Sequence, residues 1–313
     1  MKKEHWPELA YKEAKQTYDT MHRWAQIVGK VKLARLPWMN HSWHLALLVT
    51  PTGLTTGDIP GDSKHFQINF DFRQHQLQII TSKLEERIFD LRTLSVASCY
   101  HHVLTTLNNF GIACEINPIP CEIPDAVPFH LDDTHSAYDP LHAADWHQAL
   151  LNADEVFTQF RAEFIGKSSP VHLFWGSFDL AVSRFSGKTA PLHPGGFPNL
   201  PDWVAQEAYS HEVCSCGFWP GSEGVPFAAF YSYIYPEPEG YKTDSVAPKS
   251  AYYNENLREF LLPYEAVRTS GNPSKTLLDF LRRSTYDAAA DRAEWDKERF
   301  FFDSSSFKDK SFF

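Results

Sequence analysis

The sequence predicts an α+β fold built from two tandem, diverged repeats, each with a helix, a four-stranded antiparallel sheet and a second helix. Two observations predict this fold: an internal repeat, and the same order of helical and strand patterns in both parts of the chain. We expect the first repeat over residues 1–116, a proline-rich linker over 117–137, the second repeat over 138–302 and a flexible tail over 303–313. A chain of 313 residues that is 43% hydrophobic is long enough for two cores or one large one.

The internal repeat is clearest where residues 29–38 align without gaps with residues 166–175. Both segments begin with a Gly-Lys pair, share a leucine and end with tryptophan. We expect Gly29 and Gly166 to end helices, because glycine adopts the left-handed conformation that stops a helix and the lysine that follows complements the helix dipole.

A helix is expected at the start of each repeat. Apolar residues recur at steps of three and four from Tyr11 to Val28 and from Trp146 to Phe164, which is the spacing of one helix face. An Asp-Pro pair at 139–140 supplies the N-cap and the first-turn proline of the second of these helices.

Strand patterns follow both helices. Apolar and polar residues alternate over residues 66–72, as in an antiparallel sheet with one buried face. A fourth short strand and a closing helix complete each repeat. The other strands are expected at 44–49, 66–72 and 77–79 in the first repeat and at 178–184, 212–218 and 227–235 in the second.

The composition excludes several classes of protein. The net charge is −10 and no cluster of Lys and Arg is dense enough to neutralise a run of phosphates, so neither nucleic acid nor a membrane surface is expected as a partner. The N-terminus has no apolar signal core and nowhere do 18 apolar residues run together, so we expect a cytoplasmic protein that does not cross a membrane. Five cysteines, an odd number, favour reduced thiols over a disulfide framework.

Seven longer motifs are spread over nearly the whole chain, at residues 24–30, 40–44, 170–180, 184–187, 193–196, 209–212 and 216–221. In these motifs the chain resembles a family of bacterial proteins, domain of unknown function family 5996. The resemblance implies no activity, because none is assigned to that family.

The second repeat differs from the first by a longer insertion, residues 187–209, where the first repeat has only residues 50–63. The insertion contains four prolines and two adjacent glycines after its first residue. Long loops on a rigid sheet often carry functional sites, so we expect the site beside this loop. The alternative is a lid that covers exposed aromatic core.

Side chains that can transfer protons or bind anions are concentrated in the second repeat. Asp179 and Glu212 are the candidate acids and bases, and Arg184 would hold an anionic substrate group or pair with Asp179. The aligned positions of the first repeat lack most of this chemistry.

Three histidines, His172, His193 and His211, form the candidate metal site. Neutral imidazoles together with a carboxylate suit zinc or non-haem iron. The candidate cofactor is therefore a divalent transition metal. No HExxH, CxxC or HxH pattern supports it, and the alternative is that these side chains form hydrogen bonds within the sheet. A nucleotide cofactor is not indicated, because no Walker or dinucleotide glycine pattern occurs.

Aromatic residues crowd the same part of the chain. Trp175, Phe178, Trp219 and Tyr231 are expected to form the wall of a ligand pocket, although core between two sheets would explain them equally well. The leading hypothesis is an enzyme or binding protein with one small-molecule pocket in the second repeat. The alternative is a non-catalytic ligand sensor or a protein-interaction scaffold, and the oligomeric state is left open.

Overall fold

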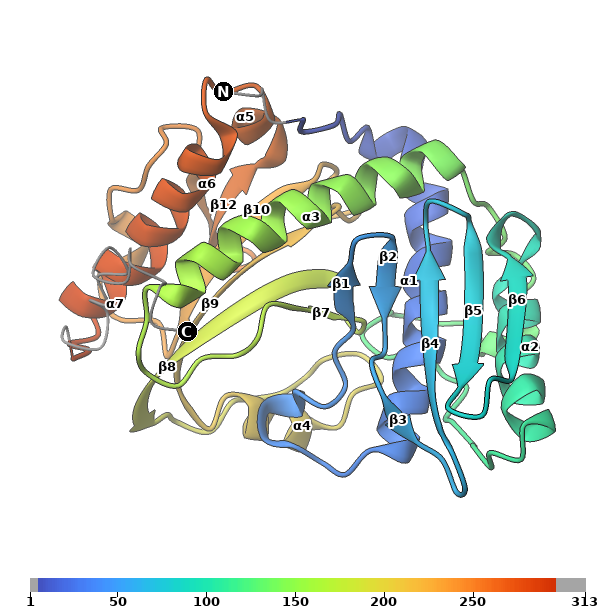
Figure 1. The fold of residues 1–313 in the computed structure, drawn as a ribbon. Coiled ribbons are helices and arrows are strands. Elements are labelled where there is room, and N and C mark those ends of the chain that lie inside the picture. Colours follow the sequence, from blue (N-terminus) through green and yellow to red (C-terminus); the bar gives the residue numbers. More distant parts are fainter. Residues whose placement is uncertain (1–4, 297–313) are drawn as a thin grey trace, which may run out of the picture.

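The structure is a computed structural model that describes residues 5–296 (Figure 1). The tail expected at residues 303–313 lies outside the described residues. None of the described helices combines the length and the apolar composition needed to span a bilayer. The α-helices are α1 (Tyr11–Arg35), α2 (Val96–Asn109), α3 (Pro140–Ala162), α4 (Asp202–Ala208), α5 (Tyr264–Arg268), α6 (Pro273–Leu281) and α7 (Ala288–Asp291).

Two antiparallel sheets complete the fold, which is of the predicted α+β class. The strands of the first sheet are β1 (Leu48–Thr50), β2 (Gly53–Thr55), β3 (Ile59–Pro60), β4 (His65–Asp71), β5 (Gln76–Thr81) and β6 (Glu86–Asp90). The strands of the second sheet are β7 (His172–Phe174), β8 (Asp179–Thr189), β9 (His211–Trp219), β10 (Ala229–Tyr235), β11 (Tyr252–Asn254) and β12 (Glu259–Pro263).

The prediction of four strands in each sheet is wrong, because each sheet has six. The additional strands are β2 and β3 in the first sheet and β7 and β11 in the second, and none is longer than 3 residues. Strands this short do not show the alternation of apolar and polar side chains on which the prediction relied. The tandem repeat itself stays a prediction.

The two sheets are connected and share one core. Their orders are β1-β2-β4-β5-β6, with β3 paired to β4, and β11-β12-β10-β9-β8-β7. A β-bridge joins the neighbouring edges, where the backbones of Leu47 and Leu173 exchange hydrogen bonds of 2.9 and 2.8 Å. Helix α3 packs against β1 and β8, and Figure 1 shows it crossing in front of the second sheet and passing the upper ends of β1 and β2.

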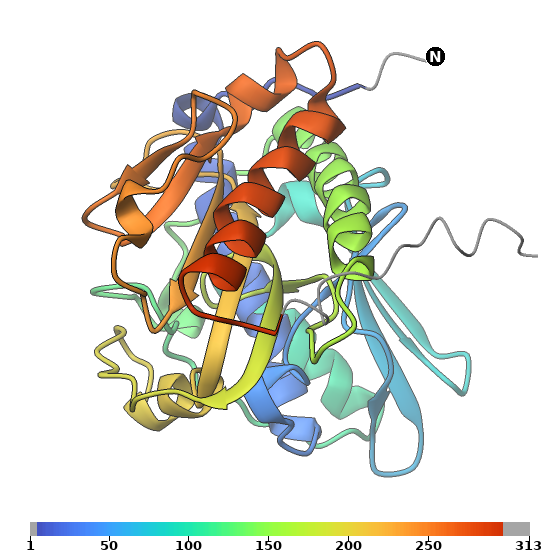
Figure 2. The same ribbon diagram turned by 90° about the vertical axis from the view of Figure 1, so that its left-hand side faces the viewer.

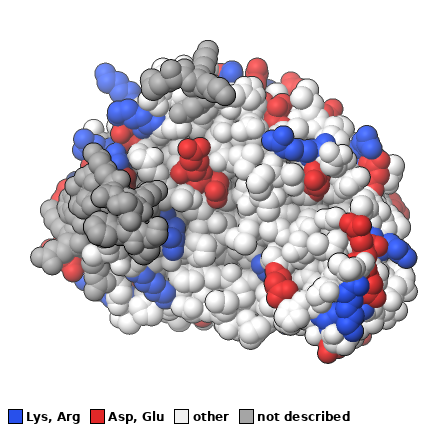
Figure 3. Space-filling model, in the orientation of Figure 1, with Lys and Arg blue, Asp and Glu red and all other residues white. Residues whose placement is uncertain are grey.

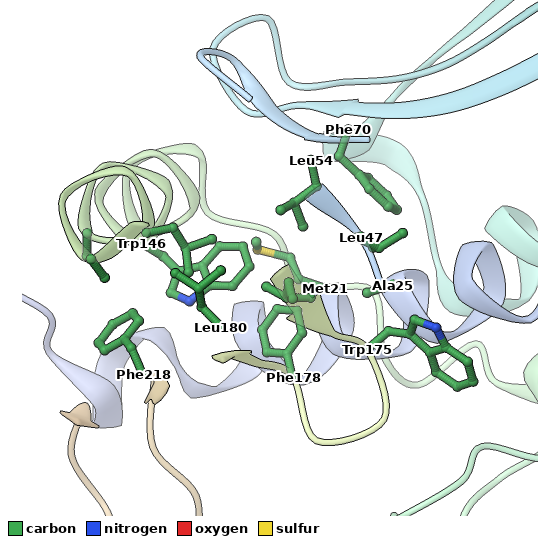
Figure 4. Packing of buried hydrophobic residues seen from close by; sticks show 14 of the residues in the cluster. Met21, Ala25, Leu47, Leu54, Phe70, Trp146, Trp175, Phe178, Leu180 and Phe218 are labelled. Atoms are coloured by element: carbon green, nitrogen blue, oxygen red, sulfur yellow. The ribbon is translucent and has the colours of Figure 1, made fainter. Parts of the chain in front are cut away.

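Aromatic packing dominates this shared core. Figure 4 shows Met21 of α1, Trp146 of α3 and Phe178 of the β7–β8 turn meeting between the sheets. The rings of Trp146 and Phe178 stack at 4.7 Å with an interplanar angle of 17°. Truncating such a buried ring to alanine costs about 3–5 kcal/mol, so this contact holds the β7–β8 turn firmly against the core.

The expectation that Gly29 ends a helix is wrong, because α1 continues through it to Arg35. A Cβ atom at Gly29 would lie 2.2 Å from the indole ring of Trp175. Glycine is therefore required here so that α1 can approach Trp175, and not for a left-handed backbone conformation. Gly166, in contrast, lies beyond the end of α3 at Ala162.

One face of the second sheet is covered by helices. Helices α3 and α6 pack side by side over this face (Figure 2). Alternation along β8 and β9 turns Leu180, Val182 and Phe218 toward the helices, where all three are buried. The opposite face of the sheet is left for the candidate site.

Candidate functional site

The face of the second sheet that points away from the helices forms the floor of a cavity of about 1070 Å³. Its walls come from α1, from residues 121–124, from the short 3₁₀ helix η1 (Asn40–Ser42) and its neighbours, and from the loop between β8 and β9 that contains α4. This volume is at the upper end of the range of small-molecule sites. The insertion expected at residues 187–209 lies along one wall.

Strand alternation determines which side chains the floor presents. The strands pair in register, so that Gly217 lies opposite Ala181 on one side and Tyr231 on the other. The floor residues are Asp179, Ala181, Ser183 and Phe185 of β8, Val213 and Ser215 of β9, Tyr231 and Tyr233 of β10, and Glu259 of β12.

Asp179 accepts two hydrogen bonds from hydroxyl groups. Ser177 Oγ donates to Oδ1 at 2.5 Å, and the Tyr231 hydroxyl donates to Oδ2. A Cβ atom at Gly217 would lie 2.4 Å from the Tyr231 hydroxyl oxygen, so glycine leaves the space in which Tyr231 reaches Asp179. Burial raises the pKa of Asp179, and the two hydroxyl donors oppose this rise.

Two further carboxyl groups, those of Glu122 and Glu259, line the same cavity. Burial and the charge of Asp179 raise the pKa of Glu122 to about 7 and that of Glu259 to about 8. We call Glu122, Asp179 and Glu259 the carboxyl trio. Across the described part of the chain, neither glutamate carboxyl of the trio has a hydrogen-bond donor or a basic partner.

Glu122 is positioned by contacts that converge from distant parts of the chain. The Gln26 side chain of α1 accepts a hydrogen bond from the backbone N–H of Cys121 at 2.9 Å and donates to its carbonyl at 2.8 Å. The backbone N–H of Glu122 donates to the carbonyl of Pro198 at 2.7 Å. A Cβ atom at Gly176 would lie 2.0 Å from Glu122 Oε1, so this glycine leaves room for the carboxyl group.

Backbone strain accompanies this arrangement. Glu122 and Phe178 have φ angles of 61° and 60°, in the left-handed region that residues other than glycine seldom occupy. Both residues line the cavity. Strained residues persist only where surrounding contacts hold them, and such strain is concentrated at functional sites.

His22 fixes the turn that carries Phe178 and Asp179. Its Nε2 lies 2.8 Å from the carbonyl of Gly176, and its ring stacks on Phe178 at 5.1 Å. Burial lowers the pKa of His22 to about 4, so the ring is neutral and Nε2 carries the proton that it donates to the carbonyl. His22 therefore acts as a positioning group.

Aromatic side chains supply much of the remaining lining. The Trp175 Nε1 donates to the carbonyl of Leu45 at 2.9 Å, which anchors this ring. Tyr231 and Tyr233 stack at 6.1 Å, and the hydroxyl groups of Tyr209 and Tyr233 are 2.7 Å apart. Trp219 meets Tyr231 edge to face at 6.2 Å.

The structure brings together five of the residues singled out from the sequence, since Asp179, Trp175, Phe178, Trp219 and Tyr231 all line the cavity. It adds Glu122 and Glu259, which the sequence analysis missed. Tyr209 and Tyr233 line the cavity as well. Alternation on β12 could have pointed to Glu259 once the exposed face of that strand was known.

Arg184 and Glu212 do not join the carboxyl trio, because both extend from the opposite face of the second sheet. The Arg184 guanidinium is buried 3.4 Å from the ring centroid of Phe160 and donates to its backbone carbonyl. Glu212 accepts a hydrogen bond of 3.0 Å from Ser186 Oγ. An anion-binding role for Arg184 therefore has no support in this geometry.

The three candidate metal ligands lie in separate surroundings. His172 is buried in β7, where burial lowers its pKa to about 3. His193 stacks on Tyr209 at 4.5 Å, and His211 lies beside Ser210, whose Oγ is 3.1 Å from its Nδ1. Within residues 5–296, no three His, Cys, Asp or Glu side chains are placed to hold one metal ion. The residues present do not fit a three-histidine metal site.

Charge is distributed unevenly between the cavity and the outer surface. On the face shown in Figure 3, acidic and basic side chains are interspersed. The cavity is lined by five acidic and two basic side chains. The titratable groups that line it are Tyr11, Lys15, Tyr18, Asp19, His22, Arg23, His41, Cys121, Glu122, His135, Asp179, Tyr209, Glu223, Tyr231, Tyr233 and Glu259.

The fold and the site together define an α+β protein with a large acidic, aromatic cavity on the open face of its second sheet. Comparison with known families matches residues 6–301 to the family of unknown function DUF5996, and the chain belongs to this family. Neither the comparison with curated proteins nor the comparison with solved structures gave a match.

Proposed function

We propose that the protein binds a small molecule in this cavity and that the carboxyl trio transfers protons to or from it. The observation that carries the proposal is the gathering of Glu122, Asp179 and Glu259 in one cavity of small-molecule size. General acid–base catalysis is most effective when the pKa of the group lies near the working pH, as is the case for Glu122 and Glu259.

The trio has a natural division of roles. Asp179 accepts two hydroxyl hydrogen bonds, which favour its ionised form, and its charge raises the pKa of the other two carboxyls. Glu122 or Glu259 would therefore hold a proton near neutral pH and donate it, while the ionised partner accepts one. The Tyr231 hydroxyl orients Asp179 and does not need to titrate.

A structural role explains the trio poorly. Burying an ionisable group without a partner is unfavourable, and folded proteins usually pair such groups. Functional sites are the places where proteins retain locally unfavourable arrangements. The same cavity without proton transfer would describe a ligand sensor, which is the alternative.

The binding part of the proposal is tested with a set of fluorine-labelled fragments that includes alcohols, amines, carboxylic acids and sugars, observed by ¹⁹F NMR. Fragments should bind the wild type, and Ser183→Phe, which places a ring on the cavity floor, should abolish their binding. Ser63→Phe, at an exposed serine outside the cavity, is the matched control and should bind as the wild type does. Equal binding to the wild type and Ser183→Phe, or no binding, would contradict the proposal.

A further inference from the structure

The basic side chains of the cavity are already engaged. Lys15 Nζ lies 2.6 Å from Asp19 Oδ2 and 3.6 Å from a carboxylate oxygen of Glu223. Arg23 Nε lies 3.5 Å from Asp132 Oδ2, and Asp132 is fully buried. Neither cation is therefore directed at the carboxyl trio.

Two other partly buried carboxylates, by contrast, have basic partners. Glu163 pairs with Arg282 at 2.5 Å, and Asp244 pairs with Arg292 at 2.6 Å. Among the described residues, Glu122 and Glu259 have no such partner although both are largely withdrawn from water. The trio thus presents negative charge to the cavity that no basic side chain among the described residues neutralises.

The surroundings of the trio suit a positively charged ligand group. Carboxylates bind ammonium groups through charge-assisted hydrogen bonds. The faces of aromatic rings also attract cations, and Trp219, Tyr231 and Tyr233 line the cavity beside the trio. An anionic ligand would meet like charge, and a neutral ligand would leave the carboxylates unpaired.

We propose that the ligand carries an ammonium group, which lies against the carboxyl trio with its apolar part along the aromatic wall. This inference rests on the proposed function, because it assumes that the cavity is the binding site. The amine supplies the countercharge that residues 5–296 do not, and its binding favours the ionised forms of Glu122 and Glu259. The groups that face Glu259 in the cavity are Asp179 and the three tyrosines at 209, 231 and 233.

The experiment compares two probes of the same size, 4-fluorobenzylamine and 4-fluorobenzyl alcohol, by ¹⁹F NMR titration at a mildly alkaline pH where the amine is protonated. The amine should bind at least about tenfold more tightly than the alcohol, as expected for a desolvated ion pair with hydrogen bonds. Glu122→Gln and Glu259→Gln should each weaken amine binding by at least about fivefold and leave alcohol binding within about twofold. Glu155→Gln, at an exposed glutamate of α3 outside the cavity, should change neither.

Two results would overturn the inference. Alcohol binding as tight as amine binding, lost in Ser183→Phe, would refute the ammonium preference while leaving the small-molecule cavity in place. Absence of amine binding, or amine binding that is unchanged in both glutamine variants, would also refute it. Thermal unfolding of each variant checks that the folded protein is being compared.

Discussion

Glu259→Gln should stabilise the ligand-free protein at alkaline pH and should have a much smaller effect at acidic pH. Glutamine has nearly the same shape as glutamate but cannot ionise, so the substitution removes only the charged form. In the wild type this charge is partly buried and interacts with Asp179, without a basic partner in the described chain. Its ionisation therefore opposes folding, and the variant avoids that opposition.

The size of the effect follows from the shift in pKa. The pKa of Glu259 rises from an ordinary value of 4.5 to about 8 in the folded protein. For a carboxyl group whose folded pKa is raised, the stability contribution is fully present below the unfolded pKa and is lost as pH rises through the folded value. Between about pH 6 and about pH 9 the wild type should lose roughly 2.5 kcal/mol relative to Glu259→Gln, at ~1.4 kcal/mol per pH unit up to the folded pKa.

Thermal unfolding followed by circular dichroism at several pH values measures this difference. For a chain of this length, roughly 2.5 kcal/mol corresponds to a widening of the Tm gap between variant and wild type by about 5 °C from about pH 6 to about pH 9. Tyr209, Tyr231 and Tyr233 face Glu259 but stay neutral over this range, because burial raises the pKa of each above its ordinary value. Titrating groups that do not interact with Glu259 are common to both proteins and cancel in the comparison.

Two controls make the result specific. Glu155→Gln removes an exposed glutamate from α3 and should follow the wild type at every pH. Asp179→Asn removes the neighbouring charge and should lower the pKa of Glu259, which reduces the difference between glutamate and glutamine at position 259. A gap in Tm between wild type and Glu259→Gln that stays constant from about pH 6 to about pH 9 would refute the reasoning, since it would mean that Glu259 ionises as it does in water.

Three further substitutions test how the site is held. Gly217→Ala should destabilise the protein by roughly 1–3 kcal/mol in chemical unfolding, because its Cβ would lie 2.4 Å from the Tyr231 hydroxyl and 2.5 Å from the carbonyl of Leu180. Gln26→Leu should cost about 1–3 kcal/mol and increase amide hydrogen exchange near residue 121, because it leaves a buried N–H and carbonyl unpaired. Gly29→Ala, despite the higher helix propensity of alanine, should lower Tm and alter tryptophan fluorescence, because the new methyl would meet the indole ring at 2.2 Å. An unchanged Tm for any of these would contradict the corresponding contact.

Local patterns predicted the parts of the fold that depend on neighbours in sequence. The stripes of α1 and α3 and the alternation of β4 and β5 were visible because one face of each element is buried over several turns or residues. The two- and three-residue strands and the continuation of α1 through Gly29 could not be seen in this way. Both depend on what lies opposite in the folded chain, such as the Trp175 ring against α1.

The candidate site was only partly predictable for a similar reason. Asp179, Trp175 and Phe178 come from one short segment, so their proximity is local. Arg184 is separated from Asp179 by an odd number of positions on β8, so alternation alone places the two side chains on opposite faces. Which face would carry the cavity depended on where α3 and α6 pack.

Glu122 shows why the decisive residue escaped the sequence analysis. It lies in residues 117–137, which were predicted to be a linker because they have no helical or strand pattern, and its position depends on Gln26 of α1 and Pro198 of the β8–β9 loop. These contacts join segments that are far apart in sequence, and they hold Glu122 at a φ of 61°. Strain and an unpaired carboxyl both oppose folding, so the surrounding contacts stabilise an arrangement that gives the fold no evident benefit. A bound cation would remove the electrostatic part of this opposition, which is why ligand binding and the stability of the carboxyl trio should be linked.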